Sequence, residues 1–212
     1  MTRYLLLLAL VAAAAAGCTP VYTVHVDTFS QLKGPLPAGT SIYVSADPNS
    51  RNPILAETIA SKLRSLLQER GYTPAPKAEG AAYMLTFRAG IDSTRVLDYA
   101  PVARPYGFYG GFGGWHHGFG YGYGYSYVPY IETVYAHWLE TRLYPQGENA
   151  GSPPQPVWIG NAVAGMNTPE LRLTINFLLV GFIDFFATDT ERWVHVRLRE
   201  DDPRVQALAE VR

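Results

Sequence analysis

A single cysteine at the end of an apolar leader is the feature that most constrains this chain. One positive charge, Arg3, precedes an unbroken apolar run from Tyr4 to Ala16, and Cys18 follows two residues later. A basic start, an apolar segment too short to span a bilayer and small residues before a cleavage point are typical of a secretory signal peptide. Cys18 has no second cysteine to pair with. The exported chain must therefore fold around a hydrophobic core without a disulfide.

The residues around Cys18 resemble the bacterial lipobox, in which small residues precede a cysteine that receives lipid. Residues 15–18 read AAGC, and the match departs at Ala15, where leucine is most common. Two alternatives stay open: a free thiol in a chain cleaved after Ala16, or an ordinary buried cysteine. Lipidation is favoured because it consumes a thiol that would otherwise be exposed and unpaired. The resemblance implies acylation of Cys18, palmitate included. Thr19 rather than aspartate after the cysteine implies sorting to the outer membrane.

The rest of the chain is predicted to form one domain. We assign residues 1–17 to the signal peptide, 18–21 to a lipidated tether, 22–200 to a single α+β domain with a Gly/aromatic insertion at about 100–130, and 201–212 to a charged C-terminal tail. A net charge of −1 argues against nucleic acid as a partner, because such binding requires a concentrated basic face. The apolar segment 173–183 is too short to span a membrane, which takes about twenty residues, and it predicts a buried helix.

Hydrophobic periodicity predicts the elements of this domain. Alternating patterns predict strands at 22–26, 42–46, 83–91, 131–144, 157–160 and 194–198. Two helices are predicted to begin at Asn52-Pro53 and Thr168-Pro169, because a capping side chain followed by proline favours a helix start. This order predicts an α+β fold: a mainly antiparallel sheet with two helices packed on it, plus a Gly/Tyr-rich insert loop. The buried face of 131–144 stays open, and three histidines are predicted to be half-exposed strand residues: His25, His137 and His195.

Several short motifs add a family resemblance to this order of elements. They are Asp27-Thr28-Phe29, Gly39-Thr40 before Ile42-Tyr43-Val44, Arg70-Gly71-Tyr72, Ala81-Ala82-Tyr83 and Val157-Trp158-Ile159-Gly160. With the lipobox, these motifs resemble the uncharacterised bacterial lipoproteins grouped as DUF 4136, over most of residues 18–200. The resemblance implies a fold and a location in the cell envelope. It implies no chemistry.

Residues 106–130 read YGFYGGFGGWHHGFGYGYGYSYVPY, so nearly every position is glycine or aromatic. Three interpretations stay open: a loop without a specific ligand, an adhesive surface for glycan rings, lipid headgroups or protein, and a self-associating segment. His116 and His117 are weak metal candidates, because no Asp, Glu or Cys lies within about ten residues to complete a coordination shell. We therefore predict no metal and no cofactor. The candidate contact residues are Tyr106, Tyr109, Trp115, Tyr121, Tyr123, Tyr125 and Tyr127.

The sequence offers no recognisable catalytic motif. G-x-S-x-G, the phosphate-binding P-loop and H-E-x-x-H are all missing. Glu132 and Glu140 would lie about 26 Å apart on one strand, which is too far for paired carboxylate chemistry. The predicted function is therefore a non-catalytic binding or structural module, anchored in the outer membrane and facing the periplasm. Its partners would be the membrane and envelope glycans or proteins. The alternatives are an envelope hydrolase with an unrecognised site and a self-assembling surface component.

Overall fold

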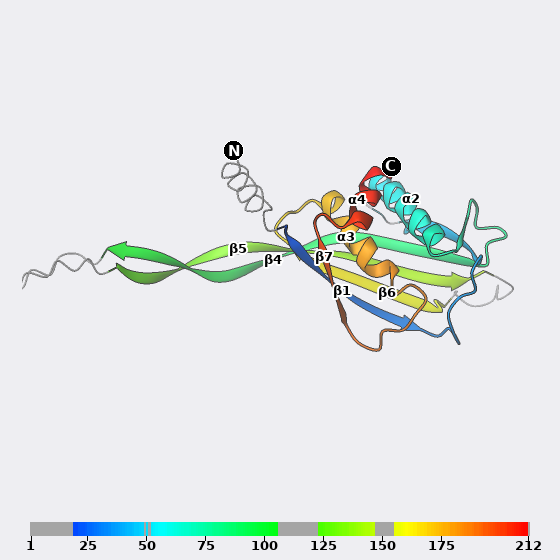
Figure 1. Ribbon diagram of the computed structural model, residues 1–212, viewed down its shortest axis with the longest axis horizontal. Helices are drawn as coiled ribbons and strands as arrows, with labels where there is room; N and C mark the ends of the chain where they lie inside the picture. The colour runs from blue at the N-terminus through cyan, green and yellow to red at the C-terminus, as the bar shows by residue number, and fades with distance from the viewer. Residues whose placement is uncertain (1–18, 49, 51, 106–122, 147–154, 212) are drawn as a thin grey trace, which may run out of the picture.

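The computed structural model describes residues 19–48, 50, 52–105, 123–146 and 155–211. In this part of the chain one seven-stranded sheet carries helices on one face (Figure 1). None of these helices is both long enough and apolar enough to cross a bilayer. The elements are β1 (Val21–Ser30), β2 (Ser41–Ala46), α2 (Pro53–Glu69), β3 (Thr73–Ala75), β4 (Tyr83–Pro105), β5 (Tyr123–Pro145), β6 (Trp158–Met166), α3 (Leu171–Ile183), β7 (Val194–Arg199) and α4 (Pro203–Glu210).

The sheet is mixed, with the strand order β3-β2-β4-β5-β6-β1-β7. β2 is parallel to both β3 and β4, and the other neighbours are antiparallel. The prediction of a mainly antiparallel sheet with two helices is therefore wrong. The physical reason is α2, which crosses one face of the sheet after β2 and returns the chain in the same direction to β3. A helical crossover of this kind makes the two strands parallel.

Three further elements differ from the prediction. α4 lies within the predicted charged tail, and it begins as α2 does, with a capping side chain followed by proline. The side chain of Asp202 accepts a hydrogen bond from the backbone N–H of Arg204 at 2.9 Å, and Pro203 occupies the first turn. β3 is an edge strand that contains Pro74, whose missing N–H is tolerated at a sheet edge. β5 begins at Tyr123, so the end of the predicted insert loop is strand.

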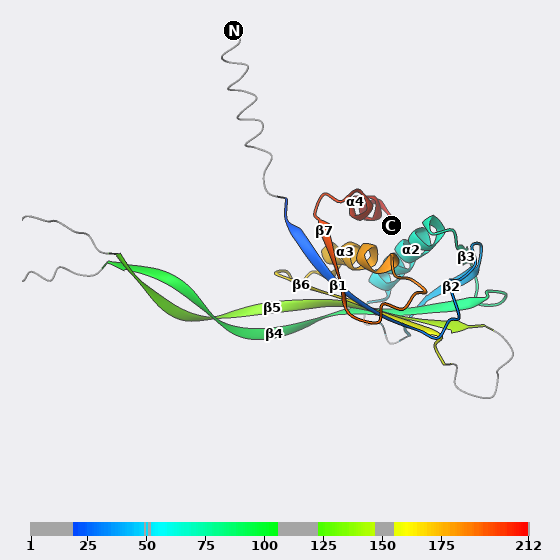
Figure 2. The same ribbon diagram turned by 60° about the horizontal axis from the view of Figure 1, so that its bottom comes forward.

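The core lies between the sheet and its helices (Figure 2). Trp158 is 1% exposed and its ring lies 5.5 Å from that of Phe182 on α3. Gly160 makes this contact possible, because a Cβ there would lie 2.6 Å from the Phe182 ring. On β5 the buried face is the one that carries Leu139 and Leu143, which settles the choice that the sequence left open.

β4 and β5 are far longer than the sheet that holds them. They pair with each other over 23 residues each, whereas β2 pairs with β4 only as far as Phe87 and β6 pairs with β5 only from Tyr135 onward. Beyond those points the two strands leave the body as a twisted two-stranded ribbon (Figures 1 and 2). We call residues 93–105 and 123–134 the arm.

Candidate functional site

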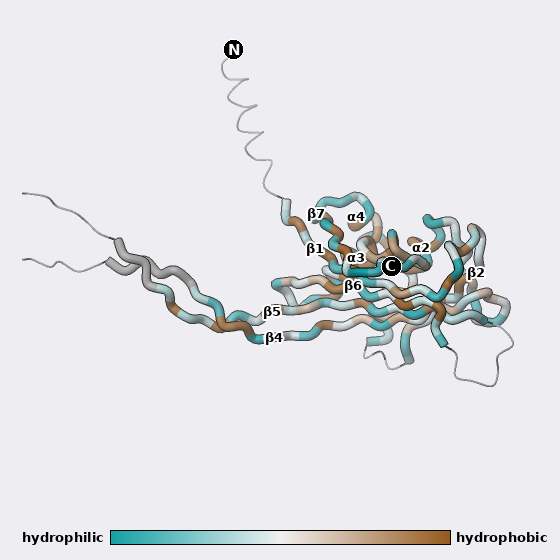
Figure 3. Tube along the Cα trace, turned by 90° about the horizontal axis from the view of Figure 1, so that it is seen from below, coloured by the Kyte–Doolittle hydropathy of each residue, from teal (hydrophilic) through white to brown (hydrophobic). Residues whose placement is uncertain are grey.

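The arm exposes large apolar side chains on one face. Directly opposite residues of an antiparallel pair share a face, and so do residues two apart on one strand. Leu97 of β4 lies opposite Ile131 of β5. Tyr99 is two residues from Leu97 on β4, and Tyr127 is four residues from Ile131 on β5, so all four side chains share one face. Their exposed fractions are 57%, 68%, 54% and 67% in that order. We call these four residues the apolar arm face; Figure 3 shows hydrophobic stretches along the ribbon outside the body.

The apolar arm face continues the core face of the sheet. On β5 the alternation that places Leu139 and Leu143 under the helices is the same one that places Ile131 and Tyr127 on the arm. In the body this side is covered by α2 and α3, but no described helix or strand covers it on the arm (Figure 2). A contiguous exposed apolar surface of this kind marks an interaction site more often than single, scattered apolar side chains do.

The opposite face of the arm is more polar. It carries Asp98 and Glu132, and the Tyr130 hydroxyl donates a hydrogen bond to Asp98 Oδ2 at 3.0 Å. That hydrogen bond to a carboxylate raises the pKa of Tyr130. Val96 and Val134 lie on this face too, less exposed than the apolar arm face at 44% and 38%. The two sides of the ribbon therefore differ in charge.

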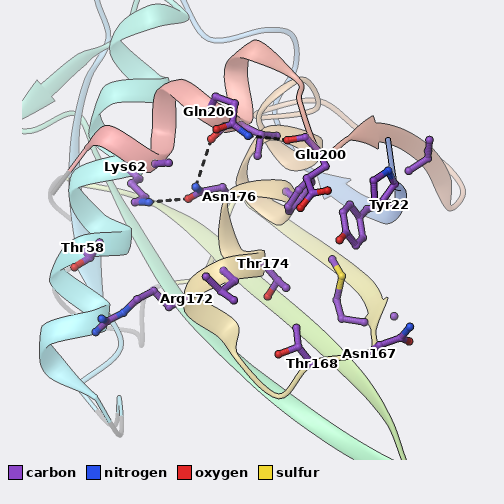
Figure 4. Close-up of a pocket in the computed structure, with 18 of the residues that line it drawn as sticks. Tyr22, Thr58, Lys62, Asn167, Thr168, Arg172, Thr174, Asn176, Glu200 and Gln206 are labelled. Atoms are coloured by element: carbon purple, nitrogen blue, oxygen red, sulfur yellow. Dashed lines mark hydrogen bonds between the residues drawn. The ribbon is translucent and has the colours of Figure 1, made fainter. Parts of the chain in front are cut away.

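A groove of about 1250 Å³ opens between the helices and the start of β1 (Figure 4). In its lining Lys62 of α2, which is 5% exposed, donates a hydrogen bond to Asn176 Oδ1 of α3 at 2.7 Å. Asn176 Nδ2 in turn donates to the Val205 carbonyl of α4 at 3.4 Å. Burial lowers the pKa of Lys62, and the described residues place no carboxylate within ion-pair distance of it. The rings of Tyr22 and Phe177 form an apolar part of the groove lining.

Beside this groove His137 is fully buried, so the prediction of a half-exposed strand residue is wrong for it. Its Nε2 lies 2.7 Å from the Thr168 carbonyl, which can only accept, and Nδ1 therefore accepts from the Thr174 hydroxyl. His25 is half-buried and His195 exposed on the open face of the sheet, where their rings meet at 4.5 Å.

Acidification should destabilise the chain through His137. Burial lowers the pKa of His137, and its hydrogen bond to Thr168 offsets this only in part. The unfolded state, with a pKa near 6.5 for histidine, then binds more protons than the folded state just below that pH. We expect the free energy of unfolding to fall as pH drops from about 7 to about 5. Urea unfolding should show this slope reduced in His137→Gln and retained in His195→Gln; equal slopes in both would contradict it.

Glu140 is held by two arginines and is not free to act as an acid or a base. Glu140 on the open face accepts ion pairs from Arg88 at 2.5 Å and Arg142 at 2.6 Å. Burial raises the pKa of Glu140, but the two guanidinium hydrogen bonds outweigh it and the pKa lies below its usual value. Glu132 lies out on the arm. Within the described ranges no group of three His, Cys, Asp or Glu residues could hold a metal ion.

The structure brings together only part of the predicted contact surface. Tyr127 belongs to the apolar arm face, and Tyr123 and Tyr125 lie farther out on β5. The arm itself was missed, although apolar, proline-containing runs on both sides of the Gly/aromatic stretch are a signal for a long hairpin. The remaining site predictions lie outside the described residues: Cys18, Tyr106, Tyr109, Trp115, His116, His117 and Tyr121.

No protein-family model matches this chain, and no curated protein sequence is significantly similar to it, so the resemblance to DUF 4136 stays a prediction. Similar solved structures include a PDZ domain protein from Parabacteroides distasonis (13% identity, 89% of this chain and 41% of that chain covered, TM-score 0.45). Others are the PelC dodecamer from Paraburkholderia phytofirmans (14%, 76% and 91%, 0.37) and a minor lipoprotein from Acinetobacter baumannii (11%, 70% and 87%, 0.27). The chain spans less than half the length of the first. At these TM-scores the similarities carry no argument about function.

Proposed function

We propose that this chain is a lipid-anchored, non-catalytic binding or structural module of the bacterial cell envelope. Acylated Cys18 holds it in the outer membrane with the domain facing the periplasm, and the arm provides the contact surface. The observation that carries this proposal is the apolar arm face, which no described element covers although it continues the core face of the sheet.

Physical chemistry supports a contact role for the arm. An isolated two-stranded ribbon is marginally stable in water, because it has no second layer on which to bury its apolar side chains. Here the ribbon carries Leu97 and Ile131 at directly opposite positions of the two strands, and both side chains are exposed to solvent. Burial against a partner would stabilise the arm and remove this surface from water. Glu140 is paired with two arginines and His137 is buried with a lowered pKa, so neither residue offers comparable support for catalysis.

Intact mass and membrane fractionation of the native protein test the proposal. We expect a mature chain that begins at Cys18, carries three acyl chains and separates with outer-membrane density. Acyl chains bury many methylenes at about 0.8 kcal/mol each, so high salt should not release the chain. A mass with the leader still attached, or with a bare thiol at Cys18, would refute the anchor.

A further inference from the structure

We infer that the apolar arm face lies in the surface of the same lipid bilayer that holds the Cys18 anchor, so that the chain meets its membrane at two points. This inference rests on the proposed function, since it takes the lipid at Cys18 as given. It assigns the arm a lipid surface as its partner, in place of an envelope protein or glycan.

The strand register places the anchor and the arm at the same end of the sheet. His25 pairs with Val163, and Val163 pairs with Trp138. Three residues nearer the N-terminus, Tyr22 is therefore level with Tyr135, where β6 stops pairing and the arm begins. Figures 1 and 2 show the start of β1 at the end of the body from which the ribbon leaves.

The short tether keeps the base of the arm near the membrane. Two residues, Thr19 and Pro20, separate Cys18 from Val21, the first residue of β1, so the chain covers three residue steps. An extended chain covers at most about 3.6 Å per residue, so Val21 lies within about 11 Å of the lipidated residue. The arm extends roughly 40 Å beyond the body at 3.3 Å per residue. With the anchor in place, the base of this ribbon, which is two strand spacings of about 4.8 Å from β1, lies within roughly 25 Å of the lipidated residue.

The chemistry of the apolar arm face suits a lipid surface. Leu97 and Ile131 offer hydrocarbon, and tyrosines such as Tyr99 and Tyr127 place an apolar ring and a polar hydroxyl at the depth of the headgroups. The same face carries the exposed cation Arg95, which can pair with lipid phosphates.

Both carboxylates of the arm lie on the other side of the ribbon. Asp98 and Glu132 occupy the alternate positions of their strands, so they face away from the apolar arm face. An anionic membrane would repel carboxylates and attract Arg95. Over residues 95–99 and 129–133 this distribution of charge matches a bilayer beneath the apolar arm face and water above its opposite side; farther out, Arg104 occupies a position on the opposite face.

Prolines make the edges of the arm poor sites for pairing with another strand. Pro101 and Pro129 lie in the two strands, one opposite Tyr127 and the other opposite Tyr99. A proline inside a paired ribbon takes the position whose N–H would point to the outer edge, so each outer edge lacks a donor there. Edge-to-edge pairing of arms from two copies is thus disfavoured, and the docking surface is a face of the ribbon.

The inference can be tested because the lipid consumes the only native thiol. One cysteine introduced by Tyr127→Cys or Ile131→Cys then becomes the single labelling site of the full acylated chain. Each variant is labelled with an environment-sensitive fluorophore and reconstituted in vesicles of phosphatidylethanolamine and phosphatidylglycerol. Lys77→Cys is the matched control, because Lys77 is exposed and lies before β4, at the end of that strand opposite the arm. Far-UV circular dichroism confirms that each variant is folded.

We expect nitroxide-bearing lipids to quench the labels at 127 and 131 several-fold more than the label at 77, and aqueous iodide to show the reverse order. If iodide reaches all three labels equally, the arm lies in water and the inference is wrong. If neither quencher reaches the arm labels, the face is buried against protein, which also overturns it. Intact mass and vesicle flotation are recorded first. If the chain carries no acyl chains, the proposed function is refuted and the inference with it. If the chain is acylated and floats with the vesicles but iodide quenches the arm labels, only the inference is refuted.

Discussion

Replacing Trp158 with alanine should lower the free energy of unfolding by about 3–5 kcal/mol, the range for large aromatic residues removed from a core. The Trp158 ring is 1% exposed and lies 5.1 Å from that of Phe186. Its Nε1–H donates to the Thr188 carbonyl at 2.7 Å, so truncation leaves a cavity and removes one of the two hydrogen bonds that this carbonyl accepts, the other coming from the Thr28 hydroxyl at 2.9 Å. Since a domain of this kind is stable by about 5–15 kcal/mol in total, the variant should be partly unfolded at modest urea concentrations.

Urea unfolding followed by far-UV circular dichroism measures this loss without relying on tryptophan fluorescence. Ile159→Ala is the matched control, because Ile159 is the next residue of β6, faces the open side of the sheet and is only half-buried. Trp158→Phe should fall between the two, since it keeps a ring in the core but loses the hydrogen bond to Thr188. Equal losses in Trp158→Ala and Ile159→Ala would mean that the helix layer does not pack on this strand as described.

Local signals in the sequence predicted most individual elements. α2 begins at Pro53, directly after its capping residue Asn52. The Asn52 side chain accepts a hydrogen bond from the backbone N–H of Leu55 at 3.0 Å, as the capping pattern indicates. Asp202-Pro203 has the same pattern, and α4 was missed because its eight residues carry only two buried apolar positions, Val205 and Leu208. A short helix with so few core contacts leaves a weak periodic signal.

The order of the strands and the groove could not be predicted in this way, because they depend on contacts between distant residues. β2 pairs with β4 only after α2 has crossed the sheet, and no local pattern distinguishes that arrangement from an antiparallel one. Lys62 and Asn176 are 114 residues apart, and each looks like an ordinary helix residue in the sequence. His137 lies on a strand in which both alternations are rich in apolar residues, so its burial was decided by the position of α3.

Removing Asn176 from its hydrogen bond with Lys62 should lower the free energy of unfolding far more than removing Lys62. Asn176→Leu leaves a buried ammonium without its acceptor, and we expect a loss of about 2–3 kcal/mol in the free energy of unfolding. Lys62→Met removes the charge and keeps an unbranched side chain of similar length. The change should cost less than about 1 kcal/mol and can be stabilising, because a buried charge no longer has to be desolvated.

The double variant Lys62→Met with Asn176→Leu separates these causes. If Asn176→Leu is destabilising because the Lys62 ammonium is left without an acceptor, replacing Lys62 as well should recover at least about 1 kcal/mol of the lost free energy of unfolding. If the cost arises from the lost hydrogen bond between Asn176 and the Val205 carbonyl, the double variant stays as unstable as Asn176→Leu alone. A Lys62→Met chain that unfolds more readily than Asn176→Leu would contradict the assignment altogether. It would show that the ammonium stabilises the helix layer despite its burial and its neutral partner.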